Sequence, residues 1–187
     1  MKCAQCVFRS PAAAALNLEE LSYLSQNCAE VMLRPGESIL REGTLSSHVA
    51  YIKKGLAKIH MLGPHEEDQV LKLAGPGSYI GIQTILAERV HKFSATCLEA
   101  AQVCYIDIHS FKELLKRNPD FSYALILYLC KEELLYFERL SSLSSRQVHG
   151  RLAQTILYIA RMYDALDKPF RVPLSRLELA SMINTSR

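Results

Sequence analysis

The sequence predicts an α+β protein, in which antiparallel strands precede one long helix and a small helical C-terminal part. Three observations support this prediction. Short apolar runs separated by glycines fill residues 31–108, as in an antiparallel barrel or sandwich. A stretch without glycine or proline then runs from Phe121 to Leu143. Finally, Ser175 and Glu178 have the spacing of a helix capping box.

The composition is that of a globular protein with a sizeable core. Of the 187 residues, 49% are hydrophobic and 22% are charged, which is ordinary for soluble proteins. No apolar run reaches the roughly 18 residues that a membrane-spanning helix needs, and the first residues lack the apolar core of a signal peptide. The six cysteines are scattered, unlike a disulfide framework, so we expect a reducing, cytoplasmic location.

The charge is distributed unevenly along the chain. Residues 146–187 contain seven Lys or Arg and three Asp or Glu, whereas residues 1–145 contain fifteen and sixteen. A basic end on a nearly neutral body favours contact with nucleic acid at that end.

The elements before the long helix follow from periodicity. Leucines at helical spacing predict a helix over residues 12–27, and a short helix over 109–118 leads into the long one. Between them we expect strands, with a polar hairpin tip at 63–68. The strands fall in four segments of alternating or continuously apolar residues: 31–43, 49–62, 68–81 and 94–108.

The long helix starts at Pro119, because Asn118-Pro119-Asp120 is typical of a helix start. It has two apolar faces, and an exposed helix of this kind needs two partners. We expect one face to cover the strand domain and the other to pair with a second copy of the chain; the alternative is the core helix of a monomer. The predicted dimer seam has coiled-coil spacing and consists of Leu127, Cys130, Leu134 and Phe137.

After a small polar hinge at 141–145, a helix is expected over 149–163 and a loop over 164–173. The capping box then starts a helix that reaches Ile183. The turn at 184–186 could cap a further helix with Arg187 as its first residue. We therefore divide the chain into a sensor domain (1–118), a dimerisation helix with its hinge (119–145) and the start of a DNA-binding domain (146–187).

The order and spacing of these segments resemble the CRP/FNR family of bacterial transcription regulators. The resemblance includes the motifs PGESILREG, LAGPGSYIGIQTIL, NPDFSYALILYL and LSRLELASMINTSR. It implies an N-terminal β-roll of the cyclic-nucleotide-binding type, a dimerisation helix and a C-terminal winged helix-turn-helix that is cut at the recognition helix. The implied partners are a second copy, double-stranded DNA with a two-fold operator, and RNA polymerase. The implied function is signal-controlled transcription regulation, without enzymatic activity.

The resemblance also implies which residues meet DNA. Arg187 matches the start of the recognition helix and could bind guanine in a bidentate contact. Ser175, Thr185 and Ser186 would suit phosphate contacts, which position the protein without reading sequence. Because the recognition helix is incomplete, we expect the chain as given to bind DNA poorly.

The cyclic AMP pocket of the family is only half matched. Its Gly-Glu pair is Gly81-Ile82 here, followed by Gln83 and Thr84, so the ribose acceptor is missing. His91 or Lys92 stands where an arginine is expected to hold the phosphate. The six residues form our candidate effector pocket, for which cyclic AMP is not the expected ligand and a larger or flatter apolar ligand stays open.

The cysteines suggest a different kind of signal. They make the chain resemble the FNR-like branch of the family more than the cyclic AMP binders, and FNR-like members hold a [4Fe–4S] cluster with four cysteines. Cys3 and Cys6 match the first pair and Cys104 matches the late-strand ligand, but the third N-terminal cysteine is absent near Ala12. Cys28 is the spare candidate. The same thiols could bind Zn²⁺ or form a disulfide switch. The alternative is a buried strand residue at Cys104 and a loose tail at Cys3 and Cys6.

Other functions find less support in the residues. A regulatory module that acts on a protein partner without DNA is the alternative function, which the predicted helix-turn-helix disfavours. No nucleophile–base pair or carboxylate pair indicates an enzyme. No histidine lies in a motif that would select haem, and we expect His60, His65 and His91 at the surface.

Overall fold

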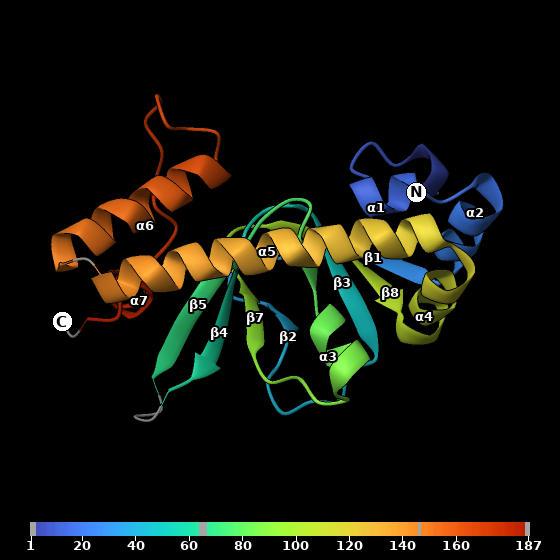
Figure 1. Cartoon of the computed structure of the whole chain (residues 1–187), viewed down its shortest axis with the longest axis horizontal. Helices are drawn as coiled ribbons and strands as arrows, with labels where there is room; N and C mark the ends of the chain where they lie inside the picture. Colours follow the sequence, from blue (N-terminus) through green and yellow to red (C-terminus); the bar gives the residue numbers. More distant parts are fainter. Residues whose placement is uncertain (1–2, 64–66, 146, 186–187) are drawn as a thin grey trace.

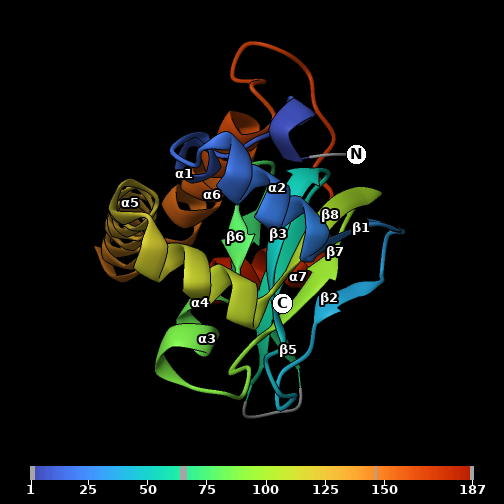
Figure 2. The same cartoon turned by 90° about the vertical axis from the view of Figure 1, so that its right-hand side faces the viewer.

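The computed structural model describes residues 3–63, 67–145 and 147–185. Two four-stranded antiparallel sheets form a β-roll, with strand orders β1-β8-β3-β6 and β2-β7-β4-β5. Helix α5 runs along the whole molecule beside the roll (Figure 1), and in the end-on view it lies to one side of the strands (Figure 2). The strands are β1 (Cys28–Leu33), β2 (Ser38–Leu40), β3 (His48–Lys54), β4 (Ala57–Leu62), β5 (Asp68–Ala74), β6 (Tyr79–Ile80), β7 (Ser94–Cys97) and β8 (Ala101–Asp107).

Each of the four predicted strand segments contains two strands, so the expectation of an antiparallel β domain is confirmed. The two sheets share an apolar core that includes Ile52, Ile59 and Val103. Gly55 makes the tight connection between β3 and β4. Its φ is +86°, and a Cβ there would collide with the backbone of Ala100 and Ala101, so only glycine fits this turn.

The predicted helix over 12–27 is wrong in one respect, because the structure has two helices there: α1 (Pro11–Ala14) and α2 (Leu18–Gln26). The break lies at Asn17, whose side chain accepts the Glu20 N–H at 2.9 Å while Glu20 accepts the Asn17 N–H at 2.9 Å. This capping box starts a new helix. The sequence signal for it is the Asn-x-x-Glu spacing.

Helices α4 (Ile108–Arg117) and α5 (Pro119–Ser145) carry the chain from the roll to the C-terminal part. Asp107 caps α4 through the Ser110 N–H, and Asn118 adopts an extended conformation that separates the two helices. Phe111 and Phe121 are buried and stack edge to face, with centroids 5.7 Å apart. The predicted polar hinge at 141–145 is wrong, because α5 continues through those serines to Ser145.

One side of α5 packs on the roll and the opposite side has no partner within the described chain. Phe121, Leu125 and Tyr128 belong to the roll-facing core. Each residue turns a helix by 100°. Glu132, seven residues after Leu125, therefore lies on the same side of α5 as Leu125, and Leu134, nine residues after it, lies on the opposite side. Leu134 is 62% exposed and Phe137 is 54% exposed, which is unusual for large apolar side chains in a row on one helix.

The C-terminal part folds back against β5. It consists of α6 (Val148–Met162) and α7 (Arg176–Met182), and the connection between them contains no strand in the described residues. Met182, Ile159 and Leu174 form a buried cluster with Leu56, Val70 and Leu73 of the roll. The Ser181 hydroxyl accepts the Val70 N–H at 2.8 Å. Thus α7 is held by the strand hairpin β4–β5 and shares a buried cluster with α6, through Met182 and Ile159.

Among the described residues, no helix is both long and apolar enough to span a bilayer. Two of the histidines expected at the surface are buried instead. His60 is bonded to Thr96 and Asp68, and His91 packs beside Gly81. The pattern of residues around His60 and His91 had not indicated that either side chain is buried. His65 lies outside the described residues.

Candidate functional site

Four cysteines from three separate parts of the chain line one cavity of about 290 Å³. Cys3 belongs to a short 3₁₀ helix, η1 (Cys3–Gln5), and Cys6 follows it. Cys28 begins β1 and Cys104 lies in the middle of β8. All four thiols that the sequence analysis named as candidate ligands are therefore neighbours, including the weak fourth candidate, Cys28.

The folding of the sheet brings Cys28 and Cys104 together. In the antiparallel pairing of β1 with β8, Cys28 is opposite Ile106 and Glu30 is opposite Cys104. Residues two apart in a strand share a face, so the two cysteines are diagonal neighbours on one face of the sheet. The N-terminal segment adds the third thiol, because Cys3 Sγ lies 3.7 Å from Cys28 Sγ. The Cys3 N–H donates to Ser25 Oγ at 3.1 Å, which fixes this approach.

An ion pair between a buried lysine and an exposed glutamate also lines the cavity. Lys53, in β3, is 3% exposed and its Nζ lies 2.6 Å from Glu30 Oε2. Burial has the largest effect on Lys53 and opposes its charge, but the bond with Glu30 and the charges of Cys104, Cys6 and Glu30 together raise the pKa of the lysine. A buried lysine with a single carboxylate partner places fixed positive charge beside the four thiols.

The three adjacent thiols differ in how readily they ionise. A hydrogen bond from Cys28 lowers the pKa of Cys104, and the charge of Lys53 acts in the same direction. The same bond raises the pKa of Cys28, because Cys28 is the donor and keeps its proton. The pKa of Cys3 is raised by its bond with Cys28 and by burial. Cys104 is therefore the first of these thiols to become a thiolate, the form that reacts and binds metals.

The donor set suits a group that binds four thiolates. Four cysteines are the usual ligands of an iron–sulfur cluster and one of the usual sets for Zn²⁺. In the described residues, however, no three His, Cys, Asp or Glu side chains are already arranged around a point that could hold a metal ion. The chemistry fits, but the segment that carries Cys3 and Cys6 would have to close on the sheet to complete such a shell.

The cysteine cavity is connected to α5 by a row of tyrosines. The Tyr51 hydroxyl donates to the Phe8 carbonyl at 2.8 Å, just after Cys6 in the chain. The ring of Tyr79 lies 4.8 Å from that of Tyr51 and 5.6 Å from that of Tyr128 on α5. The Tyr79 N–H also donates to the Tyr128 hydroxyl at 3.0 Å. Direct contacts thus connect the cysteine-bearing segment to α5.

The six candidate effector residues lie around helix α3 (Ile82–Ala87) but face different ways. Ile82 is buried in the core, and Gln83 is exposed. Lys92 is exposed and pairs with Glu88 at 3.0 Å. His91 is 5% exposed; its Nδ1 lies 3.3 Å from Thr84 Oγ1, and its ring would be 3.5 Å from a Cβ placed at Gly81. The imidazole therefore packs against the start of α3, beside Gly81 and Thr84.

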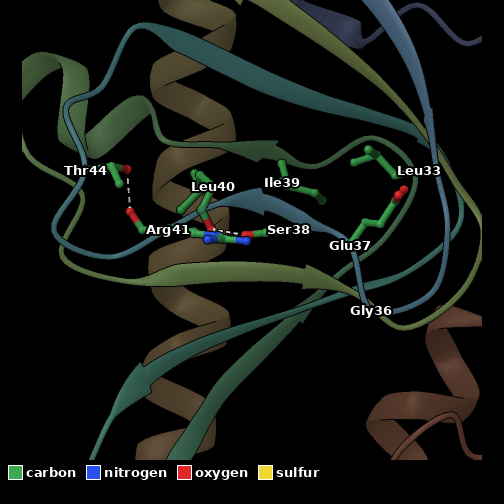
Figure 3. A pocket seen from close by; sticks show the side chains of 8 residues that line it. All are labelled: Leu33, Gly36, Glu37, Ser38, Ile39, Leu40, Arg41 and Thr44. Carbon is green, nitrogen blue, oxygen red and sulfur yellow. Dashed lines mark hydrogen bonds between the residues drawn. The ribbon is translucent and has the colours of Figure 1, made fainter.

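A separate hollow runs along β2 and is shown in Figure 3. It is about 530 Å³ and is lined by β2 and its flanking loops, including Glu37 and Arg41. The Ser38 and Thr44 hydroxyls donate to nearby backbone carbonyls at 2.9 and 2.6 Å. These polar groups are already satisfied locally, and none of the six candidate effector residues lines this hollow.

Burial lowers the pKa of His91, which predicts a specific pH dependence of stability. Below the ordinary histidine pKa of about 6.5, the unfolded chain takes up a proton that folded His91 resists. Stability should therefore be complete above pH 6.5 and fall below it, by no more than about 1.4 kcal/mol per pH unit. Urea unfolding of wild type and His91→Gln from pH 7.5 to 5 measures this. The variant should lose part of the slope, and the exposed control His149→Gln should keep all of it.

The candidate DNA-contacting residues lie at and beyond α7. Ser175 is exposed and caps α7 by accepting the Glu178 N–H at 3.2 Å, and Glu178 in return accepts the Ser175 N–H at 2.8 Å. This capping box was predicted and is confirmed. The Thr185 N–H donates to the Ala180 carbonyl at 3.1 Å, which closes the turn after α7. Ser186 and Arg187 lie outside the described residues.

Sequence reasoning missed Lys53 and Glu30. Lys53 stands in an apolar strand run, which was a signal of a buried charge with a partner. Nothing in the sequence could identify that partner, because the pairing of β1, β8 and β3 creates it.

Comparisons with known proteins agree with this architecture. Residues 30–118 match the model of the cyclic nucleotide-binding domain. The chain is 24% identical over 153 residues to the cAMP-activated global transcriptional regulator CRP of Escherichia coli O6:H1, covering 80% of this chain and 73% of that protein. It is also 24% identical over 173 residues to the transcriptional activator protein Anr of Pseudomonas protegens, covering 90% and 70%.

The fold is similar to that of the c-di-GMP responsive global regulator CLP of Xanthomonas campestris, with a TM-score of 0.76, 17% identity, and coverage of 91% of this chain and 86% of that one. A β-roll joined by a long helix to a helical C-terminal part is thus the arrangement that this chain shares with that structure. Residues 30–118 therefore belong to the cyclic nucleotide-binding domain family, and the chain as a whole is similar to transcription regulators of the CRP/FNR family.

Proposed function

We propose that this chain is a homodimeric, sequence-specific DNA-binding transcription regulator of the cytoplasm, controlled by a signal read at the four-cysteine cavity. The observation that supports this most is the convergence of four thiols and a buried lysine on one cavity, with a row of tyrosines leading to α5. The relatives named above are transcription regulators, which supports DNA and RNA polymerase as partners.

The proposed dimer uses the exposed side of α5. Leu127, Leu134 and Phe137 are large apolar residues that are each more than 40% exposed, and Cys130 lies between them. Their spacing is that of a coiled-coil seam. A second copy related by a two-fold axis would cover this stripe with its own and place two C-terminal parts side by side, as a two-fold operator requires.

The signal is proposed to act by changing the chemistry of the thiols. An iron–sulfur cluster, when bound, supplies sensitivity to oxygen or redox state. Cys104 offers the thiolate that forms first, and Lys53 stabilises negative charge on the thiols. Holding or releasing the segment that carries Cys3 and Cys6 moves Phe8, which is bonded to Tyr51, and so shifts the packing of Tyr79 against α5. Two packings of α5 across the seam then give two DNA affinities.

Cyclic AMP is not the proposed signal. CRP is named as cAMP-activated, but in this chain Ile82 replaces the ribose acceptor and His91 fills the space at the start of α3. A ligand at Gly81, Thr84 and their neighbours would have to displace a buried imidazole.

Removing single cysteines tests the cavity. Cys3→Ala, Cys6→Ala, Cys28→Ala and Cys104→Ala should each lower the bound iron or zinc of anaerobically purified protein at least fivefold, since three thiolates hold such groups poorly. The matched control is Cys130→Ala, an exposed cysteine far from the cavity, which should leave metal content unchanged. Iron with visible absorbance indicates a cluster, and colourless zinc protein indicates a thiolate metal site. Metal-free wild type, or equal losses in the control, would contradict the proposed cavity as a metal-binding sensor.

DNA binding is tested with the full-length protein. Selection from random double-stranded DNA should yield a two-fold site with half-sites about 34 Å apart, and the affinity should change between the two states of the cysteine cavity. A protein that binds no specific sequence in either state would favour the alternative, a regulatory module that acts on a protein partner.

A further inference from the structure

A second cavity, of about 280 Å³, lies between α5, β5 and α6. Its lining comes from the end of α5 that lies beside α6, away from the N-terminal helices α1 and α2 (Figure 1). Its apolar walls include Leu73, Leu143 and Met162, and two aromatic rings, Tyr136 and Tyr158, also line it. The volume is just below the roughly 300–1,000 Å³ of typical small-molecule sites, which suits a ligand with a single flat ring system.

The cavity is rich in cations without counter-ions. Its lining contains one lysine and three arginines but only two carboxylates. Lys72 is neutralised by Glu132, with Nζ and Oε2 2.5 Å apart. None of the ion pairs among the described residues includes an arginine of this cavity, and the other carboxylate, Glu138, is exposed. The three arginines are Arg139, Arg151 and Arg161.

Two of these arginines are held by backbone carbonyls instead of acids. Arg139 donates to the Leu71 carbonyl and, at 3.1 Å, to the Met182 carbonyl. Arg151 donates through Nη1 to the Asn184 carbonyl at 3.3 Å, while its Nε is buried with no acceptor. A buried donor without an acceptor costs about 1–3 kcal/mol, and proteins keep such groups rarely except where a ligand or water satisfies them.

We propose that this cavity is an effector site for a small organic anion, a phosphate or carboxylate on a flat apolar body. The anionic group would accept hydrogen bonds from the free Nε–H of Arg151 and from the guanidinium of Arg161, charge-assisted bonds that arginine makes with both kinds of oxyanion. The ring would lie against Tyr136 and Tyr158. The site is on the side of α5 opposite Leu134, so a second copy on the seam leaves it open.

The position of the site gives binding a structural consequence. Arg139 connects α5 to β5 and to the end of α7, and Arg151 connects α6 to the turn after α7. An anion that competes with the Asn184 carbonyl for Arg151 loosens the hold of α6 on the turn after α7. Binding itself does not depend on the proposed function, because it requires neither DNA nor the cysteine cavity.

Calorimetric titration of the full-length protein with three probes tests the site. The probes are AMP (phosphate on a ring), indole-3-acetate (carboxylate on a ring) and inorganic phosphate. At least one organic anion should bind, and more tightly than phosphate; comparison of the two identifies the preferred anionic group. Adenosine, which has the ring of AMP without its charge, should bind at least tenfold more weakly than AMP if the phosphate is preferred. Absence of binding by both organic anions at 5 mM would overturn the proposal.

Variants locate the binding. Arg151→Gln and Arg161→Gln should each weaken the preferred probe at least tenfold, and Arg161 is exposed, so its variant should fold normally. Arg171→Gln is the matched control, an exposed arginine of the same C-terminal part that does not line the cavity, and it should keep wild-type affinity. If AMP entered the β-roll near His91 instead, neither cavity variant would alter its affinity, and the proposal would be wrong.

Discussion

Leu134→Asp should convert the protein from dimer to monomer at micromolar concentration. The side chain is 62% exposed in the single chain and lies in the middle of the seam formed by Leu127, Cys130, Leu134 and Phe137. Burying a leucine contributes about 1.5–3 kcal/mol, and burying an unpaired carboxylate costs several kcal/mol more. Because a two-fold interface contains the residue twice, the dissociation constant should rise by a factor of at least about 1,000.

The fold of the monomer should not change, since the residue contacts no buried core in the single chain. Multi-angle light scattering reports the mass, and circular dichroism reports the helices. Lys131→Asp introduces the same carboxylate at an exposed position that flanks the seam and should weaken the dimer much less than Leu134→Asp. A dimer in Leu134→Asp, or a monomeric wild type, would show that the seam has been placed on the wrong side of the helix.

The long helix was predictable because its signal is local. Pro119 starts it, and no glycine or proline interrupts it, so periodicity alone separates the seam side from the roll side. The strand segments could be predicted, but the order of the strands in the sheets could not. The alternation of apolar and polar residues shows which side chains share a face of a sheet, but it does not show which strand pairs with which. The break at Asn17 was mispredicted because the hydrogen bonds of its capping box override the helical periodicity of the leucines around it. The continuation of α5 through Ser141–Ser145 was mispredicted because small polar residues can also form part of a helix.

The cysteine cavity was predictable only in part. Cys3, Cys6 and Cys104 were named from motif spacing, and Cys28 was the weakest of the four candidates because it follows a helix. Only the register of β1 against β8 brings Cys28 next to Cys104. Lys53 and Glu30 could not be paired from sequence, because their contact spans strands that are distant along the chain. Motif spacing can identify functional residues that match a known pattern along the sequence. Residues that meet only across strands can be identified only once the fold is known.

Phe111→Ala should lower the free energy of unfolding by about 3–5 kcal/mol, the range for a large aromatic removed from a packed core. Phe111 is fully buried and contacts both the β-roll and α5. Its ring centroid lies 6.3 Å from that of Tyr79 in the roll and 5.7 Å from that of Phe121 on α5. The cavity it leaves cannot refill easily, because the neighbouring rings are themselves held by other packing.

Urea unfolding at one fixed protein concentration measures this loss, since dimerisation makes stability concentration-dependent. Leu45→Ala is the control: the residue is 74% exposed, and its variant should stay within about 0.5 kcal/mol of wild type. Phe111→Leu separates packing from ring contacts, because it keeps most of the apolar volume but removes the stacking on Tyr79 and Phe121. If Phe111→Leu retains stability yet DNA affinity no longer responds to the cysteine state, the contacts of Phe111 with Tyr79 and Phe121 are needed to carry the signal to α5. An unchanged response would mean that the signal does not need these contacts and leaves the direct contact of Tyr79 with Tyr128 as the route.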